Sequence, residues 1–183
     1  MVLLKSEAIQ MGSSAPNFKL KDVEDHWVQL NDFKGKKALV VLFICNHCPY
    51  VQAIEDRLIQ LRRDYESKGV QLIGICSNDA SNYPEDAPPK LLKRWQEKHY
   101  GFPYLIDETQ EVAKAYGAVC TPDLYVYDQD FKLAYHGCLD DSWQKPEEVK
   151  KRHLAEALDA LLAGAKPASE QPASMGCSIK WKA

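Results

Sequence analysis

The chain has 183 residues, of which 45% are hydrophobic and 27% are charged, and these values are typical of a globular protein. A net charge of −3 gives no indication of nucleic-acid binding, and no apolar run approaches the roughly 20 residues that span a bilayer. Residues 1–11 lack the apolar segment of a secretion signal, so we expect a cytoplasmic protein. Thiols stay reduced there, so the six cysteines favour catalysis or metal binding over structural disulfides.

The first half of the chain contains alternating strand and helix patterns. An acidic turn before Trp27 predicts a short hairpin, and the apolar run KALVVLFIC predicts a strand buried on both faces. Apolar residues then recur at three- and four-residue steps, as in an amphipathic helix. The expected elements are a hairpin (18–20 and 27–30), a buried strand (37–45), a helix (49–68) and a second buried strand (70–76).

The second half begins with a turn-rich loop and continues with shorter elements. The expected elements are an inserted loop and helix (78–100), a strand (103–107), a short helix (109–117), a hairpin (123–128 and 132–137) and a final amphipathic helix (146–162). Together with the first half, this order predicts an α/β fold, with a mixed central sheet flanked by helices on both faces.

The composition changes after residue 163. Segment 164–174 is small, polar and proline-containing, which is typical of a linker. The residues that follow include Ile179 and Trp181, whose apolar side chains favour docking on the rest of the protein. We therefore predict one domain over residues 1–163, and a linker with a docked C-terminal tail over residues 164–183.

The segment CNHCP lies where the buried strand ends and the helix begins. Pro49 fits the first helical turn, because its missing N–H has no partner there. A helix N-terminus stabilises a thiolate and can lower a cysteine pKa from about 8.5 into the range of about 3.5–7.5. We expect Cys45 to attack as the thiolate and Cys48 to resolve the mixed disulfide. Asn46 and His47, between them, are the expected tuning residues.

Two other interpretations of the cysteine pair stay open. A zinc site needs a second pair of ligands at compact spacing. The nearest pair, His136 and Cys138, lies on a predicted strand, which does not form a metal-binding turn. A pair without function is the other alternative. The position between strand and helix favours redox chemistry over both, with no metal or cofactor.

An ordered set of short motifs carries a family resemblance that extends from about residue 12 to residue 183. The motifs are FICNHCPYV, SNDA, CTPD, DDS and GCSIKWK. Together they resemble the peroxiredoxin-like branch of the thioredoxin superfamily, whose members are called redoxin or AhpC/TSA-like proteins. The resemblance implies a thioredoxin fold in which Thr121 and Pro122 form a cis-proline loop that positions an extended substrate. It also implies thiol–disulfide exchange, with protein or small-molecule thiols and disulfides as partners.

The same resemblance leaves a thiol-dependent peroxidase, with peroxides as substrates, as the alternative. Superimposing the family pattern puts Cys48 at the position of the peroxidatic cysteine and Cys45 at that of a threonine. Pro122 stands where these peroxidases carry an arginine, and the loss of such a cation weakens catalysis. Both departures favour disulfide exchange. A redox-sensing or zinc-binding module is the non-enzymatic alternative.

Two further cysteines are candidates for redox roles. Cys120 directly precedes the Thr121–Pro122 loop and is expected near the dithiol. The linker from 164 to 175 reaches roughly 20 Å as a flexible coil, which lets Cys177 return to the dithiol as a resolving or regulatory thiol. Docking of the tail through its apolar side chains alone is the alternative.

The chain also departs from ordinary thioredoxins. Leu39 stands where they bury an aspartate, so the sequence assigns no proton acceptor for the second thiol. His47, directly before the second cysteine, resembles the Cys-Pro-His-Cys centre of the oxidising enzyme DsbA. The reduction potential of that centre is about −120 mV, against about −270 mV for thioredoxin.

We therefore predict that His47 raises the reduction potential above that of thioredoxin. The variant His47→Pro is expected to have a lower potential, measured by equilibration with glutathione. An unchanged or higher potential contradicts this role of His47.

Overall fold

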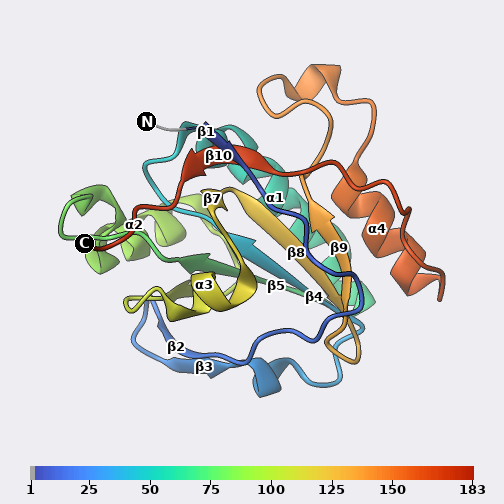
Figure 1. Ribbon diagram of the computed structural model, residues 1–183, viewed down its shortest axis with the longest axis horizontal. Coiled ribbons are helices and arrows are strands. Elements are labelled where there is room, and N and C mark those ends of the chain that lie inside the picture. Colours follow the sequence, from blue (N-terminus) through green and yellow to red (C-terminus); the bar gives the residue numbers. More distant parts are fainter. Residues whose placement is uncertain (1–2) are drawn as a thin grey trace.

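The computed structural model describes residues 3–183 (Figure 1). Its main sheet contains β2 (Lys19–Asp22), β3 (Trp27–Gln29), β4 (Ala38–Phe43), β5 (Val70–Cys76), β6 (Tyr104–Ile106), β8 (Asp123–Asp128) and β9 (Leu133–Gly137). These seven strands lie in the order β3-β2-β6-β5-β4-β8-β9. Strand β4 pairs in parallel with β5 and antiparallel with β8, so the sheet is mixed, as predicted.

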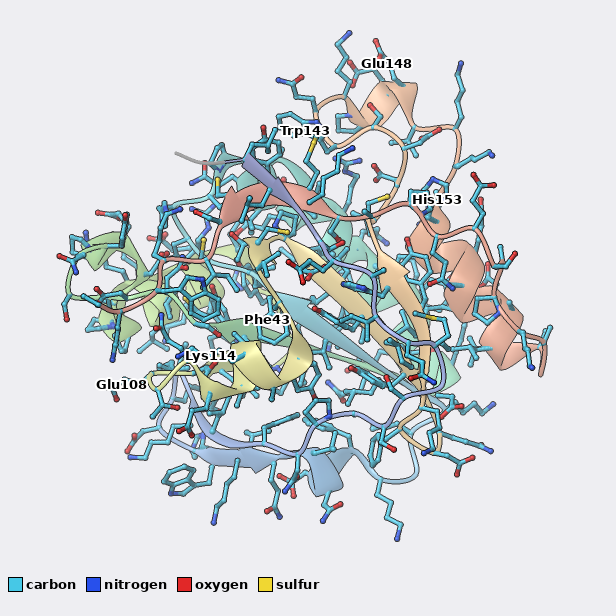
Figure 2. The ribbon with its side chains drawn as sticks, in the orientation of Figure 1. Phe43, Glu108, Lys114, Trp143, Glu148 and His153 are labelled. Atoms are coloured by element: carbon cyan, nitrogen blue, oxygen red, sulfur yellow. The ribbon has the colours of Figure 1, made fainter. Side chains whose placement is uncertain are left out.

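Helices cover both faces of this sheet. They are α1 (Pro49–Tyr65), α2 (Pro88–Lys98), α3 (Glu111–Tyr116) and α4 (His153–Leu162). Side chains alternate along β4, so that Val40 and Leu42 pack with α1 and α4, whereas Val41 and Phe43 pack with α3. All of β4 is therefore buried. Figure 2 shows Phe43 near the centre of the view and Glu148 at the periphery.

Helix α1 begins and ends where its residues favour a boundary. Pro49 is its first residue, and the apolar side chains at helical spacing from Val51 to Leu61 are buried. A 3₁₀ turn, Glu66–Lys68, follows, and Gly69 then adopts a φ of 90°, a left-handed conformation that glycine reaches without steric cost. The CNHC motif directly before Pro49 therefore lies between the end of β4 and the N-terminus of α1.

A second sheet is formed by segments that are far apart in the sequence. It contains β1 (Leu3–Lys5), β10 (Met175–Ser178) and β7 (Cys120–Thr121), in the order β1-β10-β7. In Figure 1 the red strand β10 lies between the blue strand β1 and β7. The C-terminal tail thus docks by backbone pairing on both sides of β10. Ile179 is buried, whereas Trp181, also expected to dock, remains 41% exposed.

The end of the chain also differs from the prediction in its last helix. A helix over 146–162 was expected, but Pro146–Glu148 form a 3₁₀ turn and α4 begins later. Asp141 provides the reason, because its carboxylate accepts a hydrogen bond from the Lys150 N–H at 2.9 Å and its own N–H donates to the Lys151 carbonyl. These bonds compete with helix formation. None of the helices within residues 3–183 is long and apolar enough to cross a membrane.

A buried carboxylate holds the inserted segment around α2 against α1. Glu55 is only 2% exposed. It accepts hydrogen bonds from Arg94 Nε at 2.6 Å and from the Tyr100 hydroxyl at 2.6 Å, and Lys98 Nζ lies 3.3 Å away. A carboxylate at this depth needs such partners to offset its desolvation.

We predict that Glu55→Ala lowers the free energy of unfolding by about 3 kcal/mol, because it leaves Arg94 and Tyr100 without their shared partner. The adjacent Asp56 is 80% exposed, and Asp56→Ala serves as the matched control, with an expected change below about 0.5 kcal/mol. Denaturant titration measures both values. Equal losses in the two variants contradict the role given to Glu55.

Candidate active site

The two cysteines of the CNHC motif lie in the turn between β4 and α1. Cys48 is the N-cap residue of α1, and Cys45 follows the end of β4. Their exposed fractions are 0% and 1%, respectively. Both residues are therefore buried.

The loop of Thr121 and Pro122 lies directly against both sulfur atoms. The peptide bond between these two residues is cis. Thr121 Oγ1 is 3.5 Å from Cys45 Sγ, and the Thr121 carbonyl oxygen is 3.1 Å from Cys48 Sγ. The fold thus brings together two parts of the site that were predicted separately.

Asp86, a buried carboxylate beside the dithiol turn, was not among the residues predicted from the sequence. It accepts hydrogen bonds from the backbone N–H groups of Asn46, at 2.8 Å, and His47, at 3.2 Å. Asn78 Nδ2 donates a further bond of 2.8 Å. Burial raises the pKa of Asp86, but hydrogen bonds with the His47 side chain, the Asn78 side chain and the Asn46 backbone outweigh it and lower this pKa below its ordinary value. The sequence does not distinguish Asp86 from the exposed Glu85 beside it, because Asp86 reaches its buried position only when the inserted segment folds.

His47 joins Asp86 to Cys45. Its Nδ1 atom donates to Asp86 Oδ2 at 2.5 Å and lies 3.9 Å from Cys45 Sγ. Its ring stacks on Tyr83, with the ring centroids 5.2 Å apart. The hydrogen bond to Asp86 raises the pKa of His47, which favours the imidazolium form.

The side chain of Asn46, predicted as a tuning residue, binds the inserted segment. Its side-chain amide donates to the carbonyls of Glu85 and Lys90, at 3.1 and 3.0 Å. Gln52 Nε2 donates to the Asn46 carbonyl at 2.7 Å. Asn46 therefore fastens the insert to the dithiol turn, and the hydrogen bonds found within residues 3–183 join it to neither sulfur atom.

The acidity of the two thiols is the reverse of the predicted order. The pKa of Cys48 is lowered to about 5, chiefly by the side chain of Cys45, with further hydrogen bonds from the side chain and backbone of Cys177, all against the opposing effect of burial. The N-cap position at α1 favours the same thiolate. A hydrogen bond with Thr121 lowers the pKa of Cys48 further.

The pKa of Cys45 is raised well above its ordinary value. The hydrogen bond with Cys48 is the main cause, and burial and the negative charge of Asp86 act in the same direction. These shifts favour Cys48, and not Cys45 as expected from the sequence, as the thiolate. Helix α1 begins at Pro49, as predicted, but a carboxylate that the sequence did not indicate lies on the Cys45 side.

The two additional cysteine candidates lie in different environments. Cys177 Sγ is 3.1 Å from Cys48 Sγ, so the tail does return to the dithiol. Cys120 is buried, its pKa is raised by that burial, and its sulfur contacts the Pro122 carbonyl oxygen at 3.8 Å. Within residues 3–183, Cys120 forms no hydrogen bond with Cys45 or Cys48.

Cys45, His47 and Asp86 also form a group of metal-ligating side chains. Their ligand atoms all lie within 4.8 Å of one another. A thiolate, an imidazole and a carboxylate are ligands that Zn²⁺ accepts. The sequence search for a second ligand pair could not find this group, because Asp86 lies in a distant loop. Asp86 already accepts hydrogen bonds from His47 and Asn78, so an ion here competes with those bonds.

The mixed sheet and its helical layers define a thioredoxin fold, with a cis-proline loop beside two cysteines. The AhpC/TSA family model matches residues 11–136, and the chain belongs to this family.

Similar proteins include both disulfide-exchange and peroxidase relatives. The thiol-disulfide oxidoreductase ResA of Bacillus thuringiensis subsp. konkukian is 28% identical over 148 residues, which cover 81% of each chain. Chloroplastic peroxiredoxin Q of Oryza sativa subsp. japonica is 30% identical over 165 residues, 84% of this chain and 67% of that one. An uncharacterized conserved protein from Geobacillus kaustophilus has a crystal structure that covers 100% of this chain and 97% of its own, with 48% identity and a TM-score of 0.94.

We predict that Asp86→Asn lowers the pKa of His47 towards its ordinary value of 6.5 and destabilises the protein by about 2 kcal/mol. The raised pKa of His47 stabilises the fold fully below pH 6.5 and loses this effect as the pH rises through the folded-state pKa. The lowered pKa of Asp86 stabilises the fold above pH 3.8 and loses its effect as the pH falls through its folded-state value.

The difference in unfolding free energy between wild type and Asp86→Asn is thus largest between pH 3.8 and 6.5. NMR titration of the His47 ring and denaturant titration across this range measure the two effects. Glu85→Gln, which removes an exposed charge from the same loop, is the matched control. A His47 pKa that is unaltered in Asp86→Asn refutes the coupling.

Proposed function

We propose that the protein is a thiol–disulfide oxidoreductase in which Cys48 and Cys45 form the reactive dithiol. The observation that carries the proposal is the contact of both sulfur atoms with Thr121 of the cis-proline loop, at the N-terminus of α1. The lowered pKa of Cys48, about 5, supports a thiolate at physiological pH. The relationship to ResA supports thiols or disulfides as substrates.

Cys48 is the attacking group in this mechanism. Its thiolate attacks one sulfur of a substrate disulfide, forms a mixed disulfide and releases the other substrate sulfur as a thiolate. The thiol of Cys45 then loses its proton and attacks Cys48, which forms the Cys45–Cys48 disulfide and releases the second substrate thiol. The protein is oxidised by two electrons and the substrate is reduced by two, so the exchange needs no cofactor.

His47 and Asp86 act on the second step. The Cys45 thiol must ionise in a buried site, where the negative charge of Asp86 opposes it. The His47 ring lies 3.9 Å from Cys45 Sγ and is favoured as a cation by Asp86, so it partly neutralises the local negative charge.

A thiol-dependent peroxidase is the second candidate. The low pKa of Cys48, the position of the peroxidatic cysteine in the family pattern, favours it. Membership of the AhpC/TSA family and the relationship to peroxiredoxin Q support it as well. The position of the family arginine is occupied by Pro122, which weakens the stabilisation of a peroxide transition state.

We predict that Cys48→Ser lowers insulin reduction with dithiothreitol by at least about a hundredfold, because it removes the attacking sulfur. Cys45→Ser is the matched variant: it retains the attack and is expected to accumulate a mixed disulfide on Cys48, detectable by mass spectrometry. Peroxide consumption is measured in parallel for wild type, Cys48→Ser and Cys45→Ser. Full insulin reduction by Cys48→Ser, or rapid peroxide consumption without insulin reduction by wild type, rejects the proposed activity.

A further inference from the structure

The backbone edge beside the dithiol is already occupied by a strand of the same chain. β10 pairs antiparallel with β7, with Cys177 opposite Thr121 and Ser178 opposite Cys120. On its other edge β10 pairs with β1. Figure 1 shows the resulting arrangement, in which the C-terminal segment crosses the molecule at the end of the main sheet. An extended peptide that adds to a free strand edge binds in this way.

The register of this pairing brings a third sulfur to the site. Cys177 Sγ lies 3.1 Å from Cys48 Sγ, too far for a disulfide bond and close enough for direct contact. All three cysteines are buried, with Cys177 1% exposed. Reaction of Cys48 with a second protein therefore requires that β10 leave its place.

Gly176 permits the close approach of β10 to the loop. A Cβ atom at this residue would lie 1.9 Å from the Thr121 carbonyl oxygen and 3.0 Å from Pro122 Cδ. Any larger side chain thus forces the two strands apart. This dependence on glycine indicates a specific packing contact between the tail and the site.

The residues after β10 fix its register. The Lys180 N–H donates to Asn78 Oδ1 at 2.8 Å, and the Lys180 carbonyl accepts bonds from Gln110 Nε2, at 2.8 Å, and from the Asp79 N–H, at 2.8 Å. The Ile179 N–H donates to the Val119 carbonyl at 2.9 Å. These hydrogen bonds after β10, together with the pairing of β10 to β7 and β1, fix the position of Cys177.

We propose that β10 is an internal substrate strand, and that Cys177 exchanges with the Cys45–Cys48 disulfide to form a Cys48–Cys177 disulfide that locks the tail over the site. This inference rests on the proposed dithiol function. The three-cysteine centre then has a reduced form, in which β10 can be displaced by a partner disulfide, and an oxidised form, in which the covalent bond excludes large partners.

The exchange step is balanced without an added oxidant. The Cys177 thiol loses its proton and its sulfur attacks Cys48 Sγ. The Cys48–Cys177 bond forms as the Cys45–Cys48 bond breaks, and the electron pair leaves on Cys45, which takes up a proton. Burial raises the pKa of Cys177 to about 12 in the reduced protein, and the neighbouring Cys48 sulfur contributes to the same shift. Forming the Cys45–Cys48 disulfide removes that negative charge and favours ionisation of Cys177.

Disulfide mapping tests the exchange. Reduced wild type, Cys177→Ser and Gly176→Ala are incubated with glutathione disulfide, quenched in acid, alkylated and mapped by mass spectrometry. Wild type is expected to contain the Cys48–Cys177 disulfide, and Gly176→Ala at least tenfold less of it. Cys177→Ser is expected to contain only Cys45–Cys48.

The outcomes separate this inference from the proposed function. A Cys45–Cys48 disulfide in Cys177→Ser without any Cys48–Cys177 disulfide in wild type overturns the exchange and leaves the dithiol function standing. Absence of the Cys45–Cys48 disulfide from Cys177→Ser overturns both. An undiminished Cys48–Cys177 disulfide in Gly176→Ala overturns the assignment of β10 as the strand that presents Cys177.

The rate of Cys48 alkylation by iodoacetamide tests whether β10 covers the site. Gly176→Ala is expected to react at least tenfold faster than wild type, because the added methyl group displaces the strand. Ser178→Ala is the matched control in the same strand, and its rate is expected to equal that of wild type, since it retains the backbone pairing. Equal rates for Gly176→Ala and Ser178→Ala overturn the covering role.

Discussion

The hydrogen bonds accepted by Asp86 determine the geometry of the candidate site. This one buried carboxylate holds the backbone of Asn46 and His47, and with them the turn that carries both sulfur atoms. It also binds the Asn78 amide, whose oxygen accepts a hydrogen bond from the Lys180 backbone. The dithiol turn, the insert and the C-terminal tail are therefore connected through a single group whose burial makes each missing bond costly.

The same arrangement gives the two sulfur atoms different chemical properties. Cys48 lies at the N-terminus of a helix and its pKa is lowered by hydrogen bonds with Cys45 and Cys177, whereas Cys45 faces the negative charge of Asp86. In the proposed mechanism, two identical side chains in one motif acquire separate tasks, attack and resolution, from their surroundings alone. Because the thiols are coupled, the protonation of one depends on the state of the other.

Local patterns in the sequence were sufficient for the fold and for the outline of the site. The apolar run of β4, the helical spacing after Pro49 and the Thr121–Pro122 pair each carry their signal within a few residues. The acidity order of the cysteines depends instead on groups brought together by tertiary structure. Asp86 lies in a loop without periodicity, and the register of β10 is set by contacts from both edges. The start of α4 was missed for a similar reason, since the Asp141 side chain binds the backbone that the pattern assigned to a helix.

Strand β1 has only three residues, but it helps to hold β10 in place. Leu3–Lys5 supplies one of the two edges that hold β10, although it lies at the opposite end of the sequence from Cys177. Proteolytic trimming of this segment would remove half of the ladder around β10 without touching any reactive atom. A displaced β1 would therefore leave β10, and with it Cys177, paired along the β7 edge alone.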